Sequence, residues 1–431
     1  MKILKSKSIS SFGGLNFIFK ELDENGIDRI LDQTLSKLPV QAKYSWKDLM
    51  YSFWSIYFCG GDCIEDLSVH MKQALHKNPY VKLPSPDRVL ERMKELSEPL
   101  GLFMGQRGVA IHEFSMNDKI NSLNIKILKR LRLLKSKGNI LDYDNTYIFS
   151  EKSDAIMTHK HQRGYCPGVG IIGNNIVYLE NRNGNSGAHI LQQDTLSRMF
   201  GLLRSNKINV KVFRADSASY SLAALDVINR NVEKFYIKTR IREALNELVN
   251  QVEKWEKTET GGRTLYRGSI QYCPFQDAIR RLKKQVFDKP FRLVITKEKR
   301  NDGQINMFTG EAYNYQAIIT NDFEMTDDEV VFFYNQRGKI ERQFDILKND
   351  FGWNNMPFSK LIYNTVFLLF TSICRNIYDF IINKFSKLYK GLSSNFRIKK
   401  FIFRFICIPG KWVNTGGAYR LRLYGNIYFK T

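Results

Sequence analysis

The chain has 431 residues, 43% of them hydrophobic, so it is long enough to form two or three globular domains. Its formal net charge of +23 exceeds what solubility requires and indicates a polyanionic partner, which we expect to be nucleic acid. Six scattered cysteines exclude a disulfide framework. Because the N-terminal sequence MKILKSKSISSF has no apolar signal core, we expect a reducing, cytoplasmic location.

The cysteines and histidines do not predict a zinc site. Cys59 and Cys63 are separated by three residues but have no second ligand pair nearby. His159 and His161 lie close to Cys166 in the sequence, and we expect them to be structural or to face DNA.

Apolar and basic residues are concentrated in separate segments. Residues 361–374 form the most apolar segment, bounded by Lys360 and Arg375. This segment is too short to span a bilayer, so we expect a buried helix and no membrane partner. Basic residues gather at 126–137 and at 380–431, where eleven Lys and Arg occur without any Asp or Glu.

The N-terminal part, residues 1–137, is predicted to be helical. Ser45-Trp46-Lys47-Asp48 opens one helix that runs to the glycine pair at 60–61. Ser85-Pro86-Asp87 opens another, with serine as the N-cap and proline at the first helical position. The second helix is basic and is a candidate recognition helix of a helix-turn-helix module, although a plain helical bundle fits the same pattern.

After residue 138 the pattern changes to strands alternating with helices. Residues 139–149 alternate, which places Asp142 and Asp144 on one face of a strand. The next expected elements are strands near 168–172 and 176–180, a helix over 188–204, a strand over 208–216 ending in Asp216, a helix from about 221 and a strand over 234–237. Residues 241–321 are predicted to be an insertion, containing a charged helix over 241–257 and strands near 291–297 and 313–320.

A helix is predicted from Thr326, which forms a capping box with Glu329, to Gly352, which sits where a C′ glycine would end it. An interior glycine, Gly338, is unfavourable by roughly 1 kcal/mol relative to alanine.

Four side chains on this helix, spaced Tyr-x2-Arg-x3-Glu-x6-Lys, fall within about 60° of one another. They are Tyr334, Arg337, Glu341 and Lys348. A carboxylate among cations on one helix face suits a metal ligand surrounded by phosphate-binding groups. A solvated helix face with ion pairs has the same spacing.

Carboxylates from two neighbouring strands and a packing helix can hold one or two divalent metals, and hard oxygen ligands suit Mg²⁺ or Mn²⁺. Two such ions can activate a water or a 3′-OH and stabilise the leaving oxygen of a phosphodiester. The candidate ligands are Asp142 or Asp144, then Asp216, then Glu341, with Asp345 as a rival one turn later. Spacing alone does not separate Asp142 from Asp144.

The helix motif and the two strand motifs resemble those of DDE transposases of bacterial insertion sequences. The four helix residues match the family's YREK signature without a gap. LDYDNT resembles the family's first acid motif and selects Asp144, while VFRADSASY resembles the second and selects Asp216. The N-terminal Gly-Gly-Leu, the segment LPSPDRVLERM and the tail RIKKFIFRFI resemble one subgroup, so the resemblance covers nearly the whole chain.

The resemblance implies an RNase H-like α/β mixed sheet with an inserted β-containing subdomain. The implied parts are a helical DNA-binding region (1–137), an RNase H-like catalytic core (138–240 and 322–358), an insertion subdomain (241–321) and a C-terminal helical and basic region (359–431).

The resemblance also implies the chemistry of a cut-and-paste transposase acting in the bacterial cytoplasm at the nucleoid. Asp144, Asp216 and Glu341 would ligate two Mg²⁺ or Mn²⁺ ions. Water would cut at the terminal inverted repeats of the element, and the freed 3′-OH would attack the opposite strand or the target DNA. A homodimer would hold two ends together. The residues expected to grip the terminal phosphate are Tyr334, Arg337 and Lys348.

Two groups of aromatic residues have alternative interpretations. Some relatives hold a flipped base on an aromatic residue of the insertion, and Trp255 is the counterpart here, although tryptophan at helix spacing is also typical of a core. In the tail, Phe401, Phe403 and Phe405 are expected to be core residues, with only the neighbouring cations meeting DNA.

Two alternatives remain at this stage. The first is a transposase-derived protein that binds DNA but no longer cuts it. The intact set of three acids argues against this alternative. The second is another RNase H-like nuclease, such as a resolvase, which would recognise branched structure where a transposase recognises end sequence.

Overall fold

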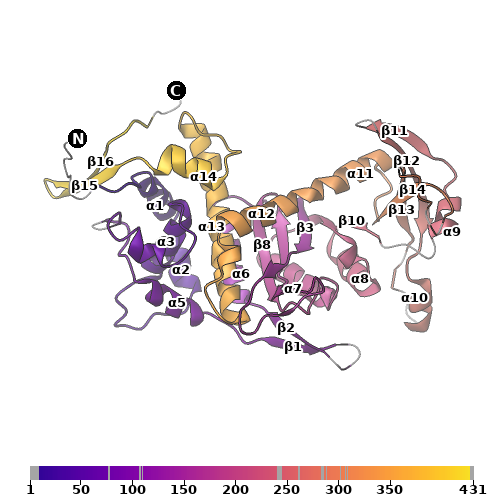
Figure 1. Cartoon of the computed structure of the whole chain (residues 1–431), viewed down its shortest axis with the longest axis horizontal. Coiled ribbons are helices and arrows are strands. Elements are labelled where there is room, and N and C mark those ends of the chain that lie inside the picture. The colour runs from indigo at the N-terminus through magenta and orange to yellow at the C-terminus, as the bar shows by residue number, and fades with distance from the viewer. Residues whose placement is uncertain are drawn as a thin grey trace.

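The computed structural model describes residues 9–427 except 76–77, 106–107, 109, 240–244, 261–262, 283–285, 288, 301, 306 and 308. A large mixed sheet runs through the middle of the molecule, with N-terminal helices at one end and the inserted strands at the other (Figure 1). In the described residues this sheet has eleven strands in the order β1-β2-β8-β7-β3-β9-β10-β14-β13-β12-β11.

Among the residues described before the sheet there are five helices, and the capping signals in the sequence explain two of them. Ser45 and Asp48 form the predicted capping box, and Ser85 caps the helix that begins at Pro86. The five helices are α1 (Leu15–Glu24), α2 (Ile27–Thr34), α3 (Trp46–Phe58), α4 (Asp66–Val69) and α5 (Pro86–Lys94).

The expectation of helices throughout 1–137 is wrong for one segment. Strands β1 (Gly101–Met104) and β2 (Ile111–Ser115) form an antiparallel hairpin, and β2 joins the edge of the sheet at β8. Each strand is too short to show a clear alternation, which is why the sequence did not reveal it. Helix α6 (Asp118–Arg130) then packs against β8 and leads into the sheet.

The central five strands have the RNase H-like arrangement. Strand β3 pairs in parallel with β9, and β9 pairs in parallel with β10, while β7 pairs antiparallel with β3 and with β8. The bounds agree with the predicted strands to within a few residues: β3 (Asn139–Asn145), β7 (Gly168–Ile172), β8 (Asn175–Arg182), β9 (Val210–Ala215) and β10 (Lys234–Lys238).

Helices cover both faces of these strands. Odd-numbered residues of β3, such as Leu141 and Tyr143, pack with α7 (Gln192–Ser205) and α8 (Leu222–Asn231) on one face. Even-numbered residues of β3 therefore face the other side, where the glutamate-bearing helix crosses the sheet. A small separate sheet follows β3: β4 (Ile148–Phe149), β5 (Ile156–Met157) and β6 (Arg163–Tyr165).

The insertion extends the main sheet beyond β10. It forms a meander joined to the core where β14 pairs with β10. Its elements are α9 (Leu245–Asn250), β11 (Glu256–Thr260), β12 (Arg263–Tyr272), α10 (Gln276–Leu282), β13 (Phe291–Lys299) and β14 (Tyr313–Thr320).

The predicted helix over 241–257 is too long. Residues 240–244 lie outside the described part of the chain, and α9 ends at Asn250. Trp255 therefore precedes β11 instead of lying on a helix. Its half-buried ring packs on the core, with Lys297 Nζ 4.3 Å from the ring centre. The charged sequence over 241–257 has no periodicity that distinguishes a helix from a strand.

The helix predicted from Thr326 to Gly352 is interrupted. The capping box of Thr326 with Glu329 is confirmed, as is Gly352 in a left-handed conformation (φ 75°) after the last turn. Between these ends, α11 (Asp327–Asn335) and α12 (Lys339–Asp350) are joined by a 3₁₀ turn, Gln336–Gly338. The turn contains Gly338, the residue least favourable to a continuous α-helix.

The apolar segment 361–374 is the first half of a longer helix than expected. Helix α13 (Leu361–Leu388) has 28 residues, which by length and composition alone could cross a membrane. However, 94% of its most apolar window is buried inside the protein, where it packs against β8, α3, α5 and α6. The helix continues through Arg375 because this cation is paired with Asp379 one turn later, at 3.5 Å.

The C-terminal segment folds back onto the N-terminus. It comprises α14 (Ile398–Phe401), a π-helical turn (Ile402–Ile406) and a hairpin of β15 (Gly410–Thr415) with β16 (Ala418–Leu423). The prediction of buried aromatics is confirmed for Phe401 and Phe405 but wrong for Phe403, which is 77% exposed. Positions 401 and 405 share one helix face, and 403 points the opposite way.

The Gly-Gly-Leu motif explains the contact between the two ends of the chain. Ser10 pairs with Gly410, and the Gly13 amide donates to the Ile408 carbonyl at 2.7 Å. A Cβ atom at Gly14 would lie 2.0 Å from the Phe405 carbonyl oxygen, so only glycine permits this approach.

We predict that Gly14→Ala destabilises the protein by about 1–3 kcal/mol, because the added methyl group forces the two segments apart. Gly201→Ala is the control, since a Cβ there meets nothing within 4 Å and alanine favours the helix by roughly 1 kcal/mol. Chemical denaturation of both variants measures the difference, and equal stability of the two would contradict this account of the motif.

Candidate active site

Two aspartates lie side by side where the central parallel strands end. Asp144 is near the end of β3, Asp216 directly follows β9, and the register pairs Tyr143 with Ala215. Both carboxylates line one cavity of about 450 Å³ on the sheet's carboxyl edge. The structure therefore brings together the two aspartates selected from the strand motifs.

The surroundings of Asp144 disfavour the ionised form of its carboxyl group. Burial and the neighbouring negative charge of Asp216 raise the pKa of Asp144 to about 6, while the Arg337 guanidinium opposes this rise. Arg337 Nη1 donates to Asp144 Oδ2 at 2.8 Å, and the Asn145 amide donates to Oδ1 at 2.8 Å. Asp216 accepts the Ala218 amide at 2.9 Å, which fixes its side chain.

Asp142, the alternative first acid, has a different role. Arg214 on β9 binds it through two hydrogen bonds, of 2.7 and 2.8 Å, and both side chains are buried. The same guanidinium donates to the Phe333 carbonyl of α11 at 2.6 Å. This ion pair ties two strands to the helix that precedes Glu341, and it leaves Asp144 as the carboxylate that lines the cavity.

Glu341 is placed apart from the two aspartates. It lies in the first turn of α12 with an exposed side chain, one turn beyond the Arg337 that contacts Asp144. In the described part of the chain, one group of three metal-ligating side chains has its atoms within 4.8 Å of one another, and this group does not include Glu341. The predicted triad is thus not assembled into a single cluster.

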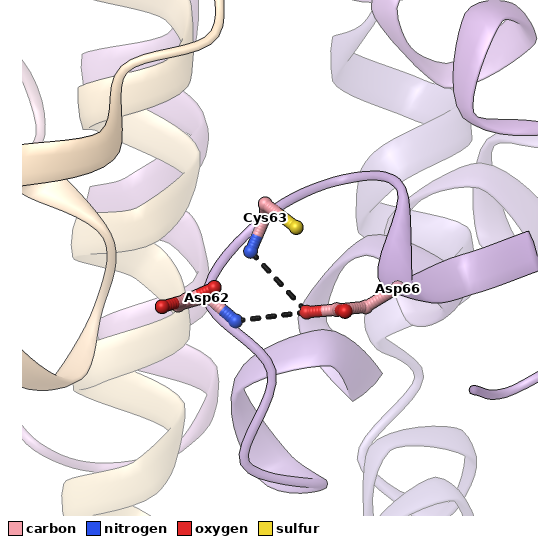
Figure 2. Close-up of side chains that lie close together, drawn as sticks. All are labelled: Asp62, Cys63 and Asp66. Carbon is pink, nitrogen blue, oxygen red and sulfur yellow. Dashed lines mark hydrogen bonds between the residues drawn. The ribbon is translucent and has the colours of Figure 1, made fainter. Parts of the chain in front are cut away.

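That group, Asp62, Cys63 and Asp66, forms a capped turn after α3 (Figure 2). Asp66 Oδ2 accepts the backbone amides of Asp62 at 3.0 Å and Cys63 at 3.3 Å. These bonds are typical of an aspartate that stabilises a turn, and they account for the cluster without a metal.

The other signature residues lie close to the aspartate pair or to Cys166 in the cavity wall. Tyr334 is buried, and its ring centre lies 5.8 Å from the Arg337 guanidinium carbon. Lys348 is half-buried near Cys166, which lines the cavity, and burial together with the nearby Lys160 lowers the pKa of its ammonium group. Residues 334–348 therefore place a phenol and a guanidinium group beside the acid pair and an ammonium group near Cys166.

The remaining wall of the cavity was not predicted. Tyr147 shares a hydrogen bond of 2.8 Å with His159 Nδ1, and a loop over 184–190 supplies His189 and backbone groups. The residues of this loop carry no sequence pattern specific to catalysis. The glycines and asparagines of 183–187 were the available signal, because they are typical of a tight loop.

A buried ionic network fixes that loop. Arg182 on β8 donates to the Ile190 carbonyl at 3.0 Å and to Thr195 at 2.5 Å. Glu180 lies 3.6 Å from Arg182 and accepts a hydrogen bond from Arg198 at 2.9 Å. Since Arg182 and Glu180 are fully buried, this network holds the wall of the cavity to the sheet.

An RNase H-like sheet with paired aspartates at the ends of its central strands, flanked by cations, is typical of enzymes that cut and join nucleic-acid backbones. Comparison with protein families agrees: the sequence model described as "Transposase DDE domain group 1" matches residues 4–430. The chain belongs to this family of DDE transposases.

Comparison with solved structures gives a distant similarity in fold. The piggyBac transposase in its synaptic complex with hairpin DNA aligns with a TM-score of 0.44 and 10% sequence identity. The alignment covers 91% of this chain and 79% of that one. A search of curated proteins finds no match.

We predict that Asp142→Asn lowers the free energy of unfolding by about 3 kcal/mol, because the buried Arg214 loses its charged partner. Asp226→Asn breaks a surface pair with Arg230 (2.8 Å) and should cost less than about 1 kcal/mol. Urea denaturation compares the two, and a similar small loss in both would show that the Arg214 pair is dispensable.

A second prediction concerns pH. The pKa of Asp144 is raised from 3.8 to about 6 in the folded protein, so the folded state binds a proton that the unfolded chain releases. The contribution of this proton to the free energy of unfolding is present at low pH and is lost as the pH rises through 6. We expect the free energy of unfolding to fall by about 1 kcal/mol between pH 5 and 7.5 for this reason.

Asp144→Asn should remove this component, whereas substitution of the exposed Asp62 by asparagine should retain it. Unfolding of metal-free protein at both pH values measures the difference. An unchanged pH dependence in Asp144→Asn would assign the effect to other groups.

Proposed function

We propose that this protein is a transposase that binds the terminal inverted repeats of its insertion sequence and catalyses metal-dependent strand cleavage and strand transfer. The observation that carries the proposal is the pair of Asp144 and Asp216 in one cavity, with Arg337 hydrogen-bonded to the first. Membership of the transposase family supports the reaction class.

The residues fit divalent metal ions, which the family generally uses. Both cavity aspartates offer hard oxygen ligands, and their mutual repulsion would be relieved by a cation between them. We propose that Asp144, Asp216 and Glu341 hold two Mg²⁺ or Mn²⁺ ions. When bound, such ions lower the pKa of an attacking water and stabilise the charge on the leaving oxygen.

Assembly of this site would require Arg337 to release Asp144 and Glu341 to approach the two aspartates. Arg337 neutralises Asp144 in the structure, and Glu341 stands one turn away in the solvent. A DNA phosphate entering the cavity would compete with Asp144 for the guanidinium, because arginine binds phosphates through paired hydrogen bonds. Release of Asp144 would then leave its carboxylate free to act as a ligand.

The other signature residues and the cavity wall would bind and orient the DNA. Tyr334, Arg337 and Lys348 would hold the terminal phosphate, and the wall formed by 184–190 would limit the positions open to the scissile strand. The formal charge of +23 supports binding along the DNA backbone at the nucleoid in the cytoplasm. Pairing of two element ends would require a homodimer.

A second candidate function follows from the position of Glu341. A carboxylate that stays outside the aspartate pair is also expected of a transposase-derived protein that binds DNA without cutting it. The same experiment separates the two functions.

We predict that, with Mg²⁺, the protein makes double-strand breaks at both flanks of a supercoiled plasmid carrying this gene's native flanking DNA. Glu341→Gln and Asp144→Asn should reduce cleavage by roughly 100-fold or more while DNA binding is retained, because each removes a ligand charge. Asp345→Asn should keep cleaving, since Asp345 pairs with Arg397 at 2.8 Å. DNA binding without a cut by the unaltered protein would favour the non-cutting function.

A further inference from the structure

A second charged cavity lies on the flank of α12 opposite Glu341. Its volume is about 240 Å³, and α12 contributes Lys339, Arg342 and Gln343 to its wall. At 100° per residue these positions lie about 120–180° around the helix from Lys348. Helix α12 therefore separates the aspartate cavity from this one, which we call the rear cavity.

The rear cavity contains a buried arginine whose hydrogen bonds are incomplete. Arg375 on α13 is 5% exposed, and its Nη2 donates to Gln343 at 3.0 Å. Its Nε and Nη1 have no hydrogen-bond partner in the described residues, although Nη1 lies 3.5 Å from the Asp379 carboxylate. Buried donors are nearly always satisfied, so these two indicate a missing acceptor.

The charge balance of the wall favours an anion as that acceptor. Lys339 and Arg342 are exposed cations at the mouth, and Arg375 lies at the back. Arg397 also lines the cavity but is neutralised by Asp350 and Asp345, each at 2.8 Å. Among the described residues that line the cavity there are thus four cations and one carboxylate, Asp379, so the wall is net positive.

Asp379 is the carboxylate in the cavity wall, and it also contacts the side-chain amides of Asn174 and Asn383. Its Oδ1 lies 3.4 Å from Asn174 Nδ2 and 3.5 Å from Arg375, and its Oδ2 accepts Asn383 Nδ2 at 3.2 Å. It contacts Arg375 through the long Nη1 contact, which leaves the buried Nε without a hydrogen-bond partner in the described residues.

We propose that the rear cavity binds a phosphate group of the DNA backbone, with Arg375 as its buried anchor and Lys339 and Arg342 at its mouth. The choice of DNA as the source rests on the proposed function and on the basic segment 380–431, which adjoins the cavity through Arg397. A tetrahedral oxyanion matches the paired donors of a guanidinium. DNA would then hold α12 on both of its flanks.

The first test is binding of inorganic phosphate, which needs no cleavage. Compared with chloride at equal ionic strength, phosphate at tenfold excess over its Kd should raise the Tm by about 1–2 °C. The double variant Lys339→Gln/Arg342→Gln should lose this rise. Both side chains are exposed, so the variant is expected to fold.

The control variant Lys207→Gln/Lys299→Gln removes the same charge from exposed positions that do not line the cavity and lie outside the basic segment 380–431. It should retain the rise in Tm. No rise in the unaltered protein, or the same rise in both double variants, would overturn the proposal of an anion site.

The second test identifies the source of the phosphate. The slope of log K against log salt, measured by anisotropy with a generic DNA duplex, should fall by about 0.9 in Lys339→Gln/Arg342→Gln relative to the control variant. If the phosphate-dependent Tm rise depends on Lys339 and Arg342 but the slope is unchanged, DNA is overturned as the source and the site takes free phosphate. Neither readout depends on catalysis, so failure of the proposed cleavage activity is distinguishable from failure of this proposal.

Discussion

The ion pair between Asp142 and Arg214 fixes the geometry on which the candidate site depends. It is buried and joined by two hydrogen bonds across the parallel strands β3 and β9. Because side chains on a strand repeat every two residues, setting Asp142 opposite Arg214 also sets Asp144 beside Asp216. A slip of one residue in this pairing would turn one acid toward the helices on the other face. The third hydrogen bond of Arg214, to Phe333, extends the same constraint to α11 and hence to the signature helix.

The sequence was sufficient to predict most central elements, because alternation and capping are local properties. The strands that end in Asp144 and Asp216, the capped helices at Ser45 and Ser85, and the end of α12 at Gly352 all follow from residues within a few positions. The RNase H-like class followed from resemblance, and family membership confirms that resemblance.

What the sequence did not predict depends on contacts between distant segments. The separate roles of Asp142 and Asp144 depend on Arg214, 72 residues away from the first of them. The cavity wall at 184–190 is held by Arg182 through tertiary contacts. The exposed position of Glu341 depends on how α12 packs against β3. None of these features leaves a periodic signal.

The contact between the chain termini has a consequence for synthesis on the ribosome. The Gly13–Gly14 segment rests on the backbone of 405–410, and the N-terminal helices share one hydrophobic core with α13. The N-terminal helices are synthesised first, but their apolar faces are covered only after α13 and residues 405–410 have been synthesised. An interrupted translation product would expose those faces and become a substrate for chaperones and proteases.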